Sequence, residues 1–272
     1  MRFDNILICT DLDGTLLLPD GSISRENAEA IAYFEREGGR FTFVTGRMPY
    51  YAAHVAERIR PNAPFGCANG GGLYDHTRGE YVFRAAPLAP DVCELIAAVE
   101  AGVPNIGIQL AGFEHSYFSQ DNEATAIFRA ETNIPHLTCP YTAPPEPIIK
   151  ILFCGDDEQI EKAAAILAAH PLSKDFTLVP SERYLFEILP KPVSKGLAIE
   201  ALCAHYGIDR ARSIAIGDYN NDIPMLRAAG LGIAVANACP DALAAADRVT
   251  VANTEHAIAR VIADIESGKL PL

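Results

Sequence analysis

Ile6-Leu7-Ile8-Cys9-Thr10-Asp11-Leu12-Asp13-Gly14-Thr15 is the stretch that decides the fold. A short apolar run bounded by turn residues is typical of a buried strand. Two carboxylates and a glycine turn follow it, and α/β proteins keep their sites outside the carboxyl ends of their strands. Because Asp is depleted in strands and is rarely buried without a partner, Asp11 and Asp13 indicate a cation, a proton or a substrate beside them.

The composition is that of an ordinary globular protein. The chain has 272 residues, of which 49% are hydrophobic and 21% charged, so it can form one large domain or two smaller ones. Its formal net charge of −13 repels nucleic acid and anionic membranes, and neither is expected as a partner. A site for an anion is therefore expected to be a local positive pocket on an acidic body.

The cysteines and the N-terminus predict a cytoplasmic protein. The start of the chain lacks the apolar stretch of a signal peptide, and no run of about 18 apolar residues is long enough to span a membrane. The seven cysteines form no CxxC pair, and Cys9, Cys93, Cys154 and Cys203 lie within apolar stretches. This pattern favours buried free thiols in a reducing compartment over disulfides.

The first third of the chain alternates between strand and helix. A helix is expected from Ser24 to the glycines at 38–39, then a strand at 40–44, a helix ending at Ile59, and a third strand at 65–67. Short loops between such elements predict parallel pairing with right-handed crossovers.

The end of the chain also alternates between strand and helix, whereas the middle has a different pattern. Helices are expected at 194–207 and 223–229, and strands at 213–216 and 231–235. Between about residues 85 and 187, hairpin-like strands alternate with helices. The sequence therefore predicts an α/β core with a parallel sheet flanked by helices, built from residues 1–84 and 188–272, and an inserted α+β domain at 85–187.

Four loops with polar chemistry fall at the carboxyl ends of the expected core strands. Each alone has an ordinary explanation: a plain turn at 11–14 or 45–47, an Asx-rich turn at 217–222, and a solvated Lys195. Lys195, however, lies in the first turn of an expected helix, where the helix dipole disfavours a cation by about a few tenths of a kcal/mol. A partner anion would offset that cost.

Taken together, the four loops resemble the haloacid dehalogenase superfamily, in its Cof-like, type IIB sugar-phosphatase branch. The matching stretches, in chain order, are Asp11–Leu16, Val44–Arg47, Asn69–Gly71, Val193–Gly196, Gly217-Asp218, Asn221–Ile223, Met225-Leu226 and Gly232–Ala238. The sequence departs from the usual pattern at Pro192 and at Gly71-Gly72. The resemblance implies a Rossmann-like core and a cap domain of the C2B type.

The resemblance also implies a role for each matching residue. Asp11 would be the nucleophile and a Mg²⁺ ligand, forming an aspartyl-phosphate. Asp13 would give its backbone carbonyl to the metal and its side chain as general acid, then base. Asp218 would bind the metal directly and Asp222 through water. The phosphate would be held by Thr45, Gly46, Asn221, the amide of Leu12 and the charge of Lys195, while Arg47 and Asn69 are candidate substrate contacts.

Simple electrostatics fits these implied roles. A carboxylate that attacks a phosphate dianion is repelled by about 4 kcal/mol for each charge pair at about 4 Å and an effective dielectric near 20. A divalent cation relieves this repulsion, and hard oxygen ligands with retained water suit Mg²⁺. The expected function is a Mg²⁺-dependent phosphomonoester hydrolase that acts on a small phosphorylated metabolite such as a sugar phosphate, as a monomer or homodimer.

Two alternatives remain open from the sequence, a phosphomutase of the same superfamily and a phosphate sensor without catalysis. Weaker candidates lie in the expected cap. His115 and His136 are interpreted as surface or packing residues and Glu187 as strand packing, whereas Lys150 and Arg183 are candidate anion contacts.

Overall fold

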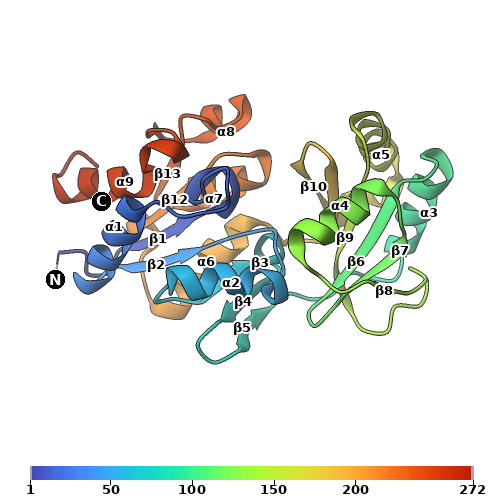
Figure 1. The fold of residues 1–272 in the computed structure, drawn as a ribbon, viewed down its shortest axis with the longest axis horizontal. Coiled ribbons are helices and arrows are strands. Elements are labelled where there is room, and N and C mark those ends of the chain that lie inside the picture. The colour runs from blue at the N-terminus through green and yellow to red at the C-terminus, as the bar shows by residue number, and fades with distance from the viewer. Residues whose placement is uncertain (1, 271–272) are drawn as a thin grey trace. The chain divides into compact units, whose positions relative to one another are not determined.

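The computed structural model describes residues 2–270, which form two compact units. The first unit comprises the chain up to Gly46, Ala53–Arg84, and the chain from Ser194 onward. The second comprises Arg47–Ala52 and Ala85–Val193. In Figure 1 the first unit carries the blue and the orange to red segments, and the second carries the green and yellow ones. The chain thus leaves the first unit and returns to it.

The first unit is built on a five-stranded parallel sheet of order β14-β13-β12-β1-β2. The strands are β1 (Leu7–Thr10), β2 (Arg40–Phe43), β12 (Ser213–Gly217), β13 (Leu231–Ala234) and β14 (Arg248–Val249). The opening apolar run is the central strand, and all four residues of β1 are buried. Continuous apolar strands are typical of parallel sheets that are covered on both faces. The short β14 lies beyond the strand that the sequence predicted as the last.

Helices flank this sheet (Figure 1). They are α1 (Arg25–Arg36), α2 (Pro49–Ile59), α6 (Lys195–Tyr206), α7 (Ile223–Ala228), α8 (Pro240–Ala245) and α9 (Ala257–Glu266). Ser24 caps α1 by accepting a hydrogen bond from the amide of Asn27, and Gly207 ends α6 in the left-handed conformation. Leu7 and Cys9 pack in one apolar cluster with Ile199 and Leu202 of α6, which fixes α6 against the central strand.

The expected third parallel strand is a different structure. β3 (Phe65–Cys67) forms no ladder with the described strands of the parallel sheet and is joined to its edge by one isolated parallel bridge, between Val44 and Gly66. It belongs instead to a three-stranded antiparallel sheet with β4 (Gly72–Asp75) and β5 (Glu80–Arg84). The turn at 68–70 explains the difference, because its positive φ angles reverse the chain and bring Gly72 opposite Cys67.

The second unit is an α+β domain with a six-stranded sheet of order β10-β11-β9-β6-β7-β8. The strands are β6 (Gly107–Gly112), β7 (Ser116–Gln120), β8 (Leu137–Thr138), β9 (Ile148–Cys154), β10 (Phe176–Glu182) and β11 (Leu185–Pro190). All pairs are antiparallel except β7 with β8. The helices are α3 (Val92–Gly102), α4 (Glu123–Thr132) and α5 (Asp157–Ala169), and residues of α3 and α5 share one apolar cluster with the sheet.

The inserted stretch begins at Ala85, as expected, but it ends at Val193 and not at residue 187. The return falls between Val193 and Ser194, because β11 pairs with both β9 and β10 and so belongs to the inserted sheet. The first turn of α2 also belongs to this unit, since Tyr50 donates or accepts a hydrogen bond of 2.7 Å with Ser116 of β7.

A buried ion pair lies in the second unit. The ammonium of Lys150 on β9 donates to a carboxylate oxygen of Glu187 on β11 over 3.0 Å, and both side chains are almost fully buried. Ser181 donates to the same oxygen over 3.1 Å. The sequence did not predict that these two residues pair.

All seven cysteines, each within the described part of the chain, are free thiols. Cys9, Cys154 and Cys203 are buried as expected, whereas Cys93 is half-buried. Among residues 2–270, no helix is both long and apolar enough to cross a membrane.

Candidate active site

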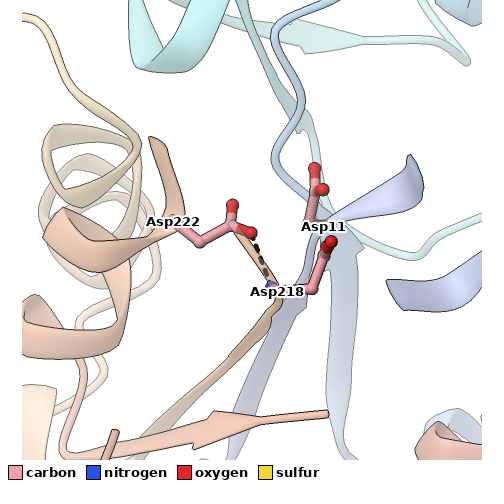
Figure 2. Close-up of side chains that lie close together, drawn as sticks. All are labelled: Asp11, Asp218 and Asp222. Carbon is pink, nitrogen blue, oxygen red and sulfur yellow. Dashed lines mark hydrogen bonds between the residues drawn. The ribbon is translucent and has the colours of Figure 1, made fainter. Parts of the chain in front are cut away.

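Three carboxylates meet at the carboxyl end of the central strands (Figure 2). Asp11 directly follows β1, and its amide donates to the carbonyl of Ile216 on the neighbouring β12 over 2.8 Å. Asp218 and Asp222 follow β12. One oxygen of each carboxylate lies within 4.8 Å of the others. Adjacent parallel strands end at the same edge of a sheet, which is why residues 11 and 218 meet although some 200 positions separate them.

Lys195 is the cation at the centre of this cluster. Its ammonium donates to Oδ1 of Asp11 over 2.7 Å and to Oδ1 of Asp222 over 2.6 Å. The side chain is only 1% exposed. It is the first residue of α6, so both carboxylates offset its unfavourable place at a helix N-terminus. Burial lowers the pKa of Lys195, but the two carboxylates outweigh burial and hold that pKa above its ordinary value.

Asp222 also braces the loop that carries Asp218. Its second oxygen, Oδ2, accepts from the backbone amides of Asp218 over 2.8 Å and Tyr219 over 3.0 Å. Figure 2 shows the first of these bonds. Asp222 is fully buried, and both of its oxygens are engaged by protein donors. A buried charge must be paired and hydrogen-bonded in this way to be tolerated.

The other two carboxylates carry an excess of negative charge. Burial, and then the charge of Asp222, raises the pKa of Asp11 well above its ordinary value, against the opposing effect of Lys195. Burial and Asp222 likewise raise the pKa of Asp218 to about 6. One lysine therefore does not compensate three carboxylates.

A tight turn at Leu12–Leu16 forms the next part of the site. Gly14 has a φ of +79°, and a Cβ at this position would lie 2.5 Å from Oδ2 of Asp218, so the turn requires a glycine. The hydroxyl of Thr15 donates to Oδ1 of Asp218 over 2.6 Å. Nδ2 of Asn237 donates to the carbonyl of Gly14 over 2.8 Å. Asp13 is exposed on this turn, next to the buried cluster.

The expected phosphate-side residues form a second group in the first unit. The amide of Asn69 donates to the carbonyl of Thr45 over 3.0 Å, and Nδ2 of Asn221 donates to Oδ1 of Asn69 over 3.2 Å. Thr45 and Asn69 are buried, as is Leu12 on the neighbouring turn. A Cβ at Gly46 would lie 3.2 Å from Nδ2 of Asn69, so the amide of Asn69 packs against Gly46.

Most of the residues that the sequence singled out lie in the first unit. The first unit holds Asp11, Leu12, Asp13, Thr45, Gly46, Asn69, Lys195, Asp218, Asn221 and Asp222. Arg47 belongs to the second unit and is half-buried there. Thr15 and Asn237 lie in stretches that match the family, but no role was expected for either residue. The signal that could have indicated them is a hydrogen-bonding side chain in a loop that follows a core strand.

The carboxylate cluster fits a divalent cation. Its donor set consists of hard carboxylate oxygens, and Mg²⁺ prefers oxygen ligands. Its uncompensated charge gives the cation an electrostatic reason to bind. Asp11 and Asp218 are the carboxylates best suited to hold it, because both oxygens of Asp222 already accept from Lys195 and from backbone amides.

A sequence model of the haloacid dehalogenase-like hydrolases matches residues 8–262. The chain belongs to this family. Its parallel sheet flanked by helices and its inserted cap are the fold of that family's solved members, so the second unit is called the cap below and the first unit the core. The chain is an enzyme of the haloacid dehalogenase superfamily, of the Cof-like type, and phosphatases are among its relatives.

Curated relatives match almost the whole chain. A putative phosphatase, YxeH of Bacillus subtilis, is 28% identical over 271 residues, which cover 97% of this chain and 99% of the relative. The HMP-PP phosphatase of Cronobacter sakazakii is 31% identical over 237 residues, which cover 86% of this chain and 85% of the relative.

Solved structures share the fold over the same length. A haloacid dehalogenase-like hydrolase from Bacteroides thetaiotaomicron has a TM-score of 0.80 at 25% identity, covering 96% of this chain and 99% of that one. The subclass IIB sugar phosphatase BT4131 has a TM-score of 0.82 at 22% identity, covering 97% of this chain and all of that one, a likeness of fold.

Proposed function

We propose that this enzyme is a Mg²⁺-dependent phosphomonoester hydrolase that works through an aspartyl-phosphate on Asp11. The observation that carries the proposal is the buried cluster of Asp11, Asp218 and Asp222 around the ammonium of Lys195. Such a cluster is costly in a folded protein unless it binds a cation and an anionic substrate. The names of the phosphatase relatives support the same reaction class.

In the first step, a carboxylate oxygen of Asp11 attacks the phosphorus atom and the bond from phosphorus to the ester oxygen breaks. The leaving alkoxide takes the proton of the Asp13 carboxyl group. Asp13 suits this work because it is exposed on the turn beside the cluster and can exchange protons with solvent. Lys195, Asn221 and the loop of Thr45 and Gly46 would hold the phosphate oxygens.

In the second step, a water molecule attacks the phosphorus atom of the aspartyl-phosphate. The water gives a proton to Asp13, and the bond from phosphorus to Asp11 breaks, which releases inorganic phosphate and restores both carboxyl groups. Asp11 must be anionic at the start, although burial and Asp222 raise its pKa. A bound Mg²⁺, held by Asp11, Asp218 and the backbone carbonyl of Asp13, would supply that charge stabilisation, with Asp222 acting through water.

The proposed substrate is a small phosphorylated metabolite, of the sugar phosphate kind. The formal charge of −13 disfavours polyanionic partners such as nucleic acid. One relative is named for HMP-PP and a structural neighbour for sugar phosphates. The seven free thiols support a reducing compartment, and we place the enzyme in the cytoplasm.

A panel of phosphate esters, tested with Mg²⁺ and with a chelator, examines the proposal. We expect the wild type to release inorganic phosphate only with a divalent cation, and Asp11→Asn to lose a factor of about a thousand or more. Asp20→Asn, which changes an exposed carboxylate of the core, is the matched control and should retain full activity.

Three outcomes contradict the proposal in different ways. Equal turnover by the wild type and Asp11→Asn would exclude Asp11 as the nucleophile. Isomerised sugar phosphate in place of free phosphate would indicate a mutase. Binding of phosphate without turnover of any ester would indicate a sensor.

A further inference from the structure

The turn at Ala68–Gly70 is unusual in its backbone. Ala68, Asn69 and Gly70 all have positive φ angles, of 49°, 51° and 93°. Glycine adopts this region readily and Asn is enriched in it several-fold, whereas the positive φ at Ala68 carries a steric cost. Backbone strain of this kind persists only where the surrounding contacts fix it.

This turn contacts the three loops on the phosphate side of the core. The amide of Asn69 donates to the carbonyl of Thr45 over 3.0 Å. A Cβ at Gly70 would lie 2.0 Å from the carbonyl oxygen of Ser194, the residue before Lys195, so the backbones pack directly against each other. Oδ1 of Asn69 accepts from Nδ2 of Asn221 over 3.2 Å.

The bond between Asn69 and Asn221 fixes one amide group in the site. A side-chain amide has two N–H donors and a carbonyl oxygen in one plane. Asn69 takes one N–H of Asn221, and this sets the direction of the other N–H and of the oxygen. Oδ1 of Asn221 is buried and has no hydrogen-bond partner among the described residues. That oxygen can accept only from a donor such as water, so the N–H of Asn221 that Asn69 does not take is the group that can donate to a phosphate oxygen.

We propose that Asn69 is a positioning residue, which orients the amide of Asn221 toward the phosphate and does not itself contact the substrate. The side chain of Asn69 is only 1% exposed, which fits a residue that acts through its neighbours. Its left-handed backbone places the amide between Gly46 and Asn221. This inference rests on the proposed function, because it assigns Asn221 to the phosphate.

Asn69→Gly tests the role with little change to the backbone. Glycine adopts positive φ readily and keeps the N–H that bonds Thr45, so only the side-chain amide is lost. The probe is inorganic phosphate, titrated calorimetrically into the Mg²⁺-loaded protein and measured as a competitive inhibitor. We expect binding about tenfold weaker in Asn69→Gly, which corresponds to about 1.4 kcal/mol.

A double-mutant cycle separates positioning from direct contact. If Asn69 acts through Asn221, Asn221→Ala weakens phosphate binding in the wild type but has little further effect in Asn69→Gly. Asn69→Asp keeps the acceptor for Asn221, so Asn221→Ala should again weaken binding in that background. This comparison also serves if Asn69→Gly fails to fold, which thermal unfolding would reveal.

Asn62→Ala is the matched control. The amide of Asn62 accepts from the amide of Phe41 and donates to the carbonyl of Gly39, both over 2.9 Å, at the opposite end of β2 from the site. It should leave phosphate affinity unchanged. Additive effects of Asn69→Gly and Asn221→Ala, or unchanged affinity in Asn69→Gly, would overturn the inference. A wild type that turns over no ester would instead overturn the proposed function.

Discussion

Replacing Asp222 by Asn should destabilise the metal-free protein, whereas the same replacement at Asp218 should stabilise it. Asp222 accepts from Lys195 with one oxygen and from two backbone amides with the other. An Asn side chain has one acceptor end and one donor end. In either orientation, its NH₂ group therefore faces a donor that the carboxylate had satisfied.

The magnitude follows from the pairing of Lys195. Removing one partner of a buried ion pair costs about 3–5 kcal/mol. Lys195 keeps Asp11, at 2.7 Å, so we expect Asp222→Asn to cost about 3 kcal/mol, at the lower end of that range.

Asp218→Asn removes a charge that Asp222 repels. Its amide oxygen can still accept from Thr15, which donates over 2.6 Å in the wild type. Burial and Asp222 raise the pKa of Asp218 to about 6, so holding this carboxylate charged at neutral pH costs the folded protein free energy. We expect a gain of about 1–3 kcal/mol without metal and a large loss of Mg²⁺ affinity.

Urea unfolding with a chelator present, followed by circular dichroism, measures both changes in the free energy of unfolding. Calorimetric titration of Mg²⁺ into each folded variant supplies the second readout. A similar loss of unfolding free energy in both variants, or a change below about 1 kcal/mol in Asp222→Asn, would refute the reasoning that Asp222 is the carboxylate that stabilises the metal-free fold and Asp218 the one that destabilises it.

Three further predictions concern the turns and the cap. Asn237→Ala removes the hydrogen bond to the carbonyl of Gly14 and so loosens the turn that carries Asp13. Steady-state kinetics should show kcat about tenfold lower with unchanged phosphate affinity. A kcat equal to that of the wild type would contradict this. Glu187→Gln removes the carboxylate charge that faces the buried ammonium of Lys150 and should cost about 3–5 kcal/mol in urea unfolding. Replacing both residues by Met should recover most of this loss, and an equal loss in the single and the double variant would contradict the argument. Gly70→Ala should cost more than about 3 kcal/mol in urea unfolding, because the strain of a positive φ adds to the clash with the carbonyl oxygen of Ser194. Gly21 has a φ of +72° and no neighbour within 4 Å, so Gly21→Ala should cost only the backbone strain. Equal costs in the two variants would contradict the packing argument.

The parallel core was predictable because its signals are local. The apolar run before Asp11 forms the central strand, and the caps of α1 and α6 lie at Ser24 and Gly207, where their residue types indicated them. One topological rule, that parallel strands end at one edge, was enough to bring Asp11 and Asp218 together. The ion pair between Lys195 and Asp11, 184 positions away, depends on how the side chains pack in the folded protein.

The differences between the expected and the observed elements also have physical reasons. The strand at 65–67 has an ordinary buried-strand composition, and nothing in it shows that the following left-handed turn reverses the chain. The expected end of the cap lies too early in the chain. β11 is as buried as a core strand, and the sequence does not show that it pairs with β9 and β10. The pairing of Lys150 with Glu187 was not predictable from the sequence, because a contact across two strands depends on their register.

The most direct test of the account is to locate the phosphoryl group during turnover. Asp13→Asn lacks the base for the second step but retains Asp11, so an ester whose leaving group needs no proton should phosphorylate this variant and leave it trapped. Mass spectrometry of the acid-quenched protein should then find one phosphoryl group on Asp11, and none on Asp11→Asn treated in the same way. A phosphoryl group on another residue, or turnover of the wild type without any label on Asp13→Asn, would contradict the account.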